Sequence, residues 1–355
     1  MKMIKDKVAF VGLGACGSNI TLLFQKRGYT CFYINGSEQD NKSLSGARNI
    51  LKLKGHDGFG GDRSISEVAL ADNIEIIEEI KKIKEEIIYL VFSTAGSTGS
   101  GLAPILCDII SELNETESLG KTVCCIAVLP KRSEALQKHI NAYNCIKELV
   151  EKEDIGSCLM IDNNKMESLE RINTIFVNQM DCFFTDEAYS SKGNVDISER
   201  LKLIKQQGMM VVSVACNGKV GKPVEYLEAL LTKNVFAPVE ADGIVEYIAV
   251  INSSEEPVKV DMIKKAVGIP VNIFVGHGAK KTITILSGLS LPFTYLSEIR
   301  EFAEEQYEER MQSRSKMGGM LKELHFGSAV PIVQEKPMKK KLSRLEMLRN
   351  LRGGQ

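Results

Sequence analysis

A glycine- and hydroxyl-rich stretch from Ser93 to Gly101 carries the residues best suited to chemistry in this 355-residue chain. The apolar run 87–92 before it is typical of a buried strand, and apolar residues recur at helical spacing over 103–113. A strand-to-helix loop presents unpaired N–H groups and the positive end of a helix dipole, which favour phosphate. The stretch therefore predicts a phosphate site, with a flexible turn as the alternative. The candidate ligands are Gly96, Ser97, Thr98, Gly99 and Ser100.

A second glycine-rich loop, Gly12 to Gly17, follows a strand expected at 7–11 and matches G-x-G-x-x-G. In a dinucleotide fold, an acidic residue ends the next strand and binds the ribose. Here that strand, 31–34, ends in Asn35-Gly36-Ser37, and one pyrophosphate does not explain two such loops. An NAD(P)-dependent Rossmann oxidoreductase remains an alternative, which binding of NADH but not GTP would establish.

Together the two loops resemble those of the tubulin/FtsZ superfamily. Residues 95–101 are similar to its Gly-Gly-Gly-Thr-Gly-Ser/Thr-Gly phosphate loop, with Ser97 in place of one glycine, and residues 12–19 are similar to its first loop. The resemblance implies GTP or GDP with Mg²⁺ as ligands. It leaves the magnesium ligands open, because Ser37 stands where bacterial relatives have Asp. In the loop at residues 12–19, the resemblance assigns nucleotide contacts to Gly14, Ala15, Cys16 and Asn19.

The resemblance extends to three further segments. Residues 58–63 look like the loop that senses the γ-phosphate, which assigns Gly60 and Gly61 to the nucleotide, with a mobile turn as the alternative. Glu134 stands where the family contacts ribose, although a Glu134–Lys138 pair on a solvated helix explains it equally simply. Asn163 and Asn178 match two guanine-contacting asparagines, and either could instead cap or bridge locally.

Residues 192–199 resemble the loop through which one subunit of the family completes the active site of its neighbour. This implies catalytic roles for Asn194, Asp196 and Glu199, whose carboxylates would orient the attacking water. Taken alone, the same residues predict a turn with an aspartate that caps a helix.

The expected architecture is α/β: a Rossmann-like parallel-sheet GTPase domain and a smaller mixed α/β domain, joined by a central helix, as in the tubulin/FtsZ fold. The glycine pair Gly318-Gly319 should weaken or end a long helix that starts near Pro292. The predicted divisions are a GTP-binding domain at 1–163, the central helix at 164–188, the carboxylate loop and C-terminal domain at 189–291, a long helix at 292–320, and a linker with a basic tail at 321–355.

Composition places the chain among ordinary globular proteins, with 44% apolar and 26% charged residues. The absence of a long apolar run and of a signal peptide predicts a cytoplasmic protein without membrane insertion. Nine cysteines without metal-ligand spacing predict free thiols and no metal site built by the protein.

Charge is distributed unevenly along the chain. Residues 336–355 hold seven Lys or Arg and one Glu, which leaves a net charge of −7 for the first 335 residues. The tail can form a helix of modest amphipathicity, so docking to a protein or nucleic acid is favoured over adsorption to a membrane. It resembles the tails of the superfamily's plasmid and phage partition GTPases, which engage a DNA-bound adaptor.

The resulting hypothesis is a GTPase that forms head-to-tail filaments, hydrolyses GTP at subunit interfaces and segregates plasmid or phage DNA. The alternatives are a cell-division GTPase of the FtsZ type, the oxidoreductase, and a nucleotide-binding protein that polymerises without turnover.

Overall fold

A computed structural model describes residues 3–152, 154–215, 222–253, 257–320 and 343–353. Its strands are β1 (Val8–Leu13), β2 (Thr30–Asn35), β3 (Ile50–Lys52), β4 (Ile87–Ser93), β5 (Thr122–Leu129), β6 (Ile155–Asp162), β7 (Gly208–Val214), β8 (Tyr247–Ser253), β9 (Asn272–Ala279) and β10 (Ile283–Leu289). They form one continuous sheet in the order β3-β2-β1-β4-β5-β6-β7-β10-β8-β9. All neighbours from β3 to β7 pair in parallel, and β10 runs antiparallel to β7 and β8.

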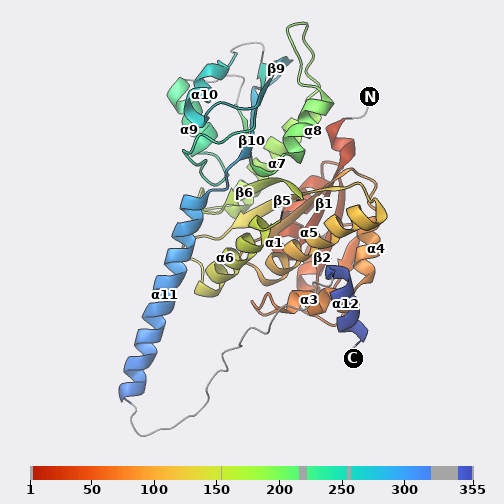
Figure 1. The fold of residues 1–355 in the computed structure, drawn as a ribbon, viewed down its shortest axis with the longest axis vertical. Helices are drawn as coiled ribbons and strands as arrows, with labels where there is room; N and C mark the ends of the chain where they lie inside the picture. Colours follow the sequence, from red (N-terminus) through yellow and green to blue (C-terminus); the bar gives the residue numbers. More distant parts are fainter. Residues whose placement is uncertain (1–2, 153, 216–221, 254–256, 321–342, 354–355) are drawn as a thin grey trace.

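Helices cover the sheet and extend beyond it (Figure 1). They are η1 (Ile4–Lys7), α1 (Gly14–Gln25), α2 (Glu38–Ser43), α3 (Ile65–Asp72), α4 (Glu75–Lys81), α5 (Ser97–Glu117), α6 (Leu136–Val150), α7 (Leu169–Thr185), α8 (Ile197–Lys205), α9 (Pro223–Leu231), α10 (Val260–Val267), α11 (Phe293–Met320) and α12 (Arg344–Gly353). The α/β architecture with a mostly parallel central sheet confirms the predicted fold class.

The parallel strands owe their pairing to burial on both faces. Every residue of β1 is buried, as are all but the last of β4 and all but the first of β5 and β6. Such near-continuous apolar strands are typical of parallel sheets covered by helices. Because neighbouring strands run the same way, the loops after β1, β4, β5 and β6 all emerge at one edge, where α/β proteins bind ligands.

The central helix α7 joins the two halves through aromatic packing. Phe176 is fully buried, with its ring 6.2 Å from that of Phe24 on α1 and 5.8 Å from that of Phe236 in the C-terminal half. Phe24 in turn stacks on Phe10 of β1. Because α7 packs between two layers, it is apolar on more than one side.

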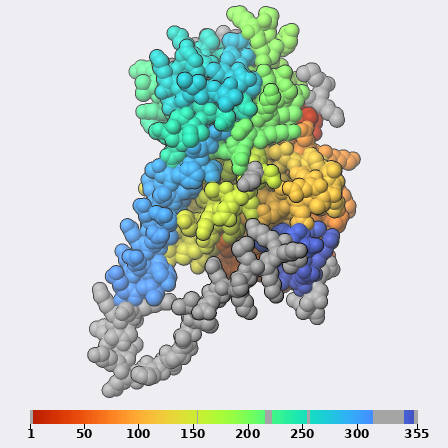
Figure 2. All heavy atoms as spheres, in the orientation of Figure 1, coloured from red at the N-terminus to blue at the C-terminus, as the bar shows by residue number. Residues whose placement is uncertain are grey.

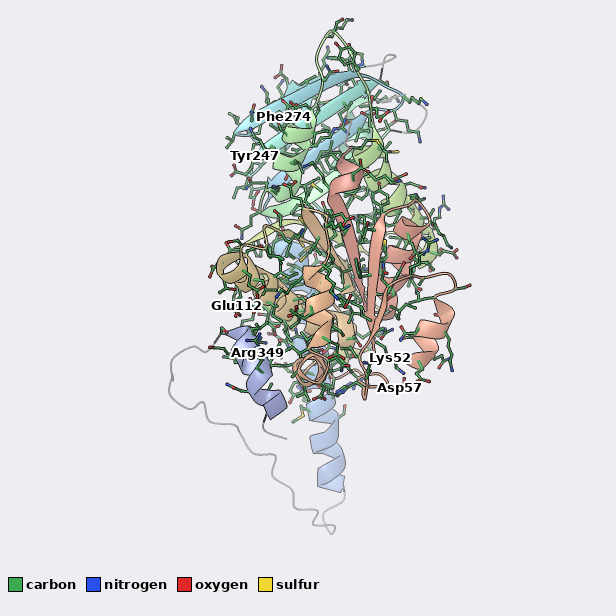
Figure 3. The ribbon with its side chains drawn as sticks, turned by 90° about the vertical axis from the view of Figure 1, so that its right-hand side faces the viewer. Lys52, Asp57, Glu112, Tyr247, Phe274 and Arg349 are labelled. Carbon is green, nitrogen blue, oxygen red and sulfur yellow. The ribbon has the colours of Figure 1, made fainter. Side chains whose placement is uncertain are left out.

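The C-terminal half completes the sheet with β8, β9 and β10, where Tyr247 and Phe274 stack across neighbouring strands (Figure 3). The helix α11 then leaves this half alongside α6 (Figure 1). It continues through Gly318 and Gly319 to Met320, so the glycine pair does not end it before residue 320, the predicted bound of this helix.

Two expectations from composition can be compared with the structure. The eight cysteines among the described residues are all free, as predicted. Within the same residues, no helix combines the length and the apolar content that a bilayer span requires.

Candidate functional site

The two glycine-rich loops lie against each other at the carboxyl edge of the sheet. Gly14 begins α1 with φ +67°, and Gly96 is the N-cap of α5. A Cβ atom on Gly99 would lie 2.9 Å from the Leu13 carbonyl oxygen, and one on Gly14 would lie 3.3 Å from Thr98 Cβ. Two helix N-termini are therefore adjacent, and their unpaired N–H groups and dipoles together favour an anion.

The hydroxyl groups of the loop at residues 96–100 are not equally available to a ligand. The Ser100 hydroxyl is buried and donates to the Gly96 carbonyl within the first turn of α5. Ser97 is half-buried and Thr98 is 9% exposed. The backbone N–H groups and the first two hydroxyls are thus the donors that this loop can offer.

A pocket of about 550 Å³ lies beside the start of α1. Its walls are formed by residues from α1, from the loop after β6 and from α7. It is lined by Cys16, Asn19, Leu23, Asn163, Leu169, Glu170 and Asn173. Three of the predicted nucleotide contacts, Cys16, Asn19 and Asn163, thus converge on one space, and the exposed Ala15 directly precedes Cys16 in the first turn of α1. Apolar walls with a few amide groups suit a flat polar ring such as a nucleobase.

Glu134 and Lys138 lie close enough to this pocket to affect the Cys16 thiol. The pKa of the Cys16 thiol is raised to about 12, chiefly by burial and then by the nearby Glu134 carboxylate, while the Lys138 ammonium acts in the opposite direction. The Lys138 Nζ also lies 3.3 Å from a Glu134 carboxylate oxygen, so the simple Glu–Lys pair is present as well. Glu134 sits in the loop before α6, because this helix begins only at Leu136.

Sequence reasoning missed Asn141, which joins the two loops expected to surround the phosphates. Its Nδ2 donates to the Gly61 carbonyl at 3.0 Å and to the Ala95 carbonyl at 3.3 Å, and the side chain is 2% exposed. The signal in the sequence was a polar amide side chain at a position of α6 that faces the core. Gly60 and Gly61 have positive φ angles, and nothing lies within 4 Å of their would-be Cβ atoms, so this side of the loop is open.

The four asparagines near the end of β6 and in α7 have different environments. Asn163 is 8% exposed and lines the pocket. The amide of Asn164 holds the loop by donating to the Pro130 carbonyl and to the Tyr295 hydroxyl of α11. Asn178 is exposed on α7 and accepts a hydrogen bond from Arg27, outside the pocket lining, whereas Asn173 of the same helix lines the pocket.

The carboxylate loop forms a capping box at the start of α8. Asp196 accepts hydrogen bonds from the Glu199 N–H at 2.9 Å and the Ser198 hydroxyl at 2.8 Å, and Glu199 accepts from the Asp196 N–H at 2.8 Å. Hydrogen bonding by the Glu199 N–H, then by Ser198, lowers the pKa of Asp196. The Asn194 side chain accepts from the Ser190 N–H at 2.7 Å. The local capping interpretation is thus realised, and it leaves an ionised, exposed carboxylate.

Arg200, which the motif analysis also missed, fixes this loop to the end of α7. It is 5% exposed and donates to the Val195 carbonyl at 3.1 Å, the Phe183 carbonyl at 2.6 Å and Asp186 Oδ2 at 3.1 Å. A planar guanidinium can satisfy three acceptors in such a fork. The position of Asp196 therefore depends on a buried residue outside the motif.

The carboxylate loop and the pocket lie at opposite ends of the molecule. Helix α8 contacts η1, which precedes β1, and Lys205 of α8 pairs with Glu86 just before β4. These contacts place α8 at the amino ends of the strands, whereas the glycine loops follow their carboxyl ends. Figure 1 shows the same separation, with α8 beside the N-terminus and α3 at the other end.

A parallel sheet with two adjacent glycine-rich helix N-termini and an amide-lined pocket is typical of proteins that bind a nucleotide. Comparison with known proteins specifies which nucleotide-binding class this is. Residues 7–170 match the Tubulin/FtsZ family, GTPase domain. Residues 7–170 therefore form a GTPase domain of the tubulin/FtsZ type, which implies GTP and GDP as nucleotides, and the dinucleotide alternative is set aside.

The relatives that span most of the chain include tubulin-like proteins of the TubZ type. TubZ from Clostridium botulinum C phage is 28% identical over 327 residues, which cover 90% of this chain and 88% of that protein. The structure of tail-truncated TubZ from C. botulinum phage c-st has a TM-score of 0.73 at 27% identity and covers 86% of this chain and 99% of that one. A GTPγS-form protofilament of TubZ from Bacillus thuringiensis serovar israelensis has a TM-score of 0.70, covering 87% of this chain and 94% of that one; at 15% identity it shares the fold alone.

Proposed function

We propose that this protein is a GTPase that assembles head to tail and hydrolyses GTP between successive subunits. The observation that carries the proposal is that the pocket and the Asp196–Glu199 pair lie at opposite ends of the folded subunit. Stacking of two copies end to end places the carboxylates of one subunit at the nucleotide of the next. The protofilament formed by the B. thuringiensis relative, which shares this fold, supports such stacking.

In this proposal the residues divide into binding and positioning roles. The helix N-termini at Gly14 and Gly96 bind the phosphates, and Asn163 with its pocket neighbours binds the base. Asp196 and Glu199 orient and polarise the attacking water in the neighbouring site, which is the usual protein contribution to GTP hydrolysis. Within the described residues, no three His, Cys, Asp or Glu side chains gather closely enough to hold a metal ion. Magnesium would therefore be held mainly by phosphate oxygens and water, as is common for this ion.

The proposed biological role is segregation of plasmid or phage DNA through an adaptor protein that binds the basic tail. The support is the similarity to a phage TubZ over 90% of the chain and the net charge of +6 in residues 336–355. The test is co-sedimentation with adaptor-bound DNA. Removal of residues 336–355 should abolish co-sedimentation while polymer still forms, and retention of the DNA would contradict the role of the tail.

The decisive experiment measures GTP hydrolysis per subunit and pelleting against protein concentration. Wild type should show one threshold concentration for both. Asp196→Asn keeps the N-cap, because Asn caps as well as Asp, yet removes the charge. This variant should pellet with GTP but hydrolyse it at least about 100-fold more slowly. Glu187→Gln neutralises an exposed carboxylate near the same loop and serves as the matched control. A specific activity that does not change with concentration would refute the shared site.

A further inference from the structure

The C-terminal helix α12 returns to the GTPase domain and packs on α3 and α5. Figure 2 shows residues 343–351 resting against this part of the molecule, and Figure 1 shows α12 next to α3. The basic tail was expected to dock on another molecule. Its described part instead contacts the same chain, while residues 336–342 lie outside the described part.

The contact is apolar at its centre. Leu348 is completely buried and Leu345 is 9% exposed, whereas Leu351, one turn further along the same helix, is 46% exposed. Complete burial of one leucine side chain favours the docked over the undocked state by about 10- to 100-fold. The helix therefore has a defined docking face on one side and a solvent-exposed side that includes Leu351.

Acidic residues of α3 and α5 complement the start of α12. Arg344 lies 3.5 Å from the Glu67 carboxylate, and the Leu345 N–H donates to Glu112 Oε2 at 3.2 Å. Figure 3 labels Glu112 and Arg349 where α5 and α12 meet. A carboxylate at a helix N-terminus interacts favourably with the helix dipole. The docking surface thus matches both the cationic side chains and the orientation of this helix.

The sequence of α12 specifies a helix that needs a partner surface. Ser343 accepts from the Glu346 N–H, and Glu346 accepts from the Ser343 N–H, which forms a capping box at its start. An isolated helix of ten residues is nevertheless only marginally stable in water. Persistent helical structure at 344–353 therefore reports docking.

We propose that the surface of α3 and α5 is a binding site for the chain's own C-terminal helix, which docks there as a reversible intramolecular latch. Residues 321–342 connect the helix to the body and can span at most roughly 75 Å when fully extended, so this connection permits an intramolecular contact. A tether also raises the effective concentration of the helix at its own site, to the order of millimolar for short flexible tethers.

The site lies on the two helices that carry the phosphate loops at their N-termini. Helix α3 begins two residues after Arg63, whose guanidinium bonds to Glu148 and to the Ser100 carbonyl of α5. A Cβ atom on Gly101 of α5 would lie 2.1 Å from Ser66 Oγ of α3, so the two helices are in close contact. While the latch is closed, Leu345 and Leu348 are covered. Any partner of this apolar face must therefore displace α12 from α3 and α5.

The test is amide hydrogen exchange of residues 347–351 in the full chain, for wild type, Leu348→Asp and the matched control Leu351→Asp. Wild type and Leu351→Asp should exchange at least about tenfold more slowly than Leu348→Asp. Exchange in β1 and β4, which lie in the sheet and outside the docking surface, should be equal in all three, which shows that the body is folded. Equal exchange of residues 347–351 in wild type and Leu348→Asp would overturn the proposal.

Dilution separates docking within one chain from docking between two copies. Protection that stays constant over a 100-fold dilution is expected for an intramolecular latch. Loss of protection on dilution would show that the helix docks on a second copy, and it would overturn the proposal. Because the comparison needs no GTP and no filament, failure of the proposed GTPase function would leave its result unaffected.

Discussion

At the scale of single residues, Asp196 is both a helix cap and the proposed catalytic carboxylate. Its pKa is lowered by the Glu199 N–H and the Ser198 hydroxyl, so the folded state favours the ionised form. A lowered folded pKa contributes stability that is complete above the unfolded value and is lost as the pH falls through the folded value. Between pH 6 and pH 3, the free energy of unfolding of wild type should therefore fall relative to that of Asp196→Asn. Urea titrations measure this difference, and a constant difference would show that the carboxylate is not stabilised in the fold.

Gly17 illustrates a residue fixed by close packing rather than by backbone conformation. A Cβ atom there would lie 1.9 Å from the Val91 carbonyl oxygen of β4. Helix propensity alone favours alanine over glycine by about 1 kcal/mol. The overlap with a buried strand should outweigh this, so Gly17→Ala should lower the free energy of unfolding by at least about 3 kcal/mol.

The matched control for Gly17 is Gly96→Ala. The nearest atom to its would-be Cβ is 3.8 Å away, and its φ of −72° suits any residue. Its free energy of unfolding in urea should stay within about 1 kcal/mol of the wild-type value. Equal effects of the two substitutions would mean that β4 moves to accommodate the methyl group at residue 17.

At the scale of elements, Asn141 connects α6 to two phosphate loops. Asn141→Ala leaves the Gly61 and Ala95 carbonyls without this donor and should cost about 1–3 kcal/mol of stability. The loop 58–63 should then be less well ordered, so the affinity for GTP should fall more than that for GDP. Competition binding measures both affinities, with the exposed Asn144→Ala on the same helix as control. An unchanged ratio of GTP to GDP affinity would contradict a role of this loop in sensing the γ-phosphate.

Local patterns predicted the elements but not their long-range connections. The apolar runs at 7–11 and 87–92 and the glycine spacing around 14 and 96 are properties of short segments, and they identified strands and loops correctly. Arg200 and Asn141 act on residues that are distant in sequence or belong to other elements, so their partners depend on tertiary packing. The docking of α12 was unpredictable for the same reason, because Leu348 gains its burial from helices more than 200 residues earlier in the chain.

At the scale of the whole molecule, the N-terminus identifies the end that should contact the next subunit. Helix η1 contacts α7 and α8, and Figure 1 places the N-terminus beside the carboxylate loop. A bulky protein fused before Met1 should therefore block end-to-end contact while leaving the pocket free. Stoichiometric GTP binding should be retained, but pelleting and GTP turnover should fall to below a tenth of the wild-type values. Proteolytic removal of the fusion should restore both, which separates steric blocking from misfolding.

The fused protein should also act on wild-type filaments, because only one of its ends is blocked. It can still present its nucleotide end to a growing filament, after which its blocked end prevents further addition. A few fused subunits per hundred should therefore reduce the pelleting of wild type by much more than their own proportion. A reduction that is merely proportional, or none at all, would show that the end bearing Asp196 does not form the contact between subunits.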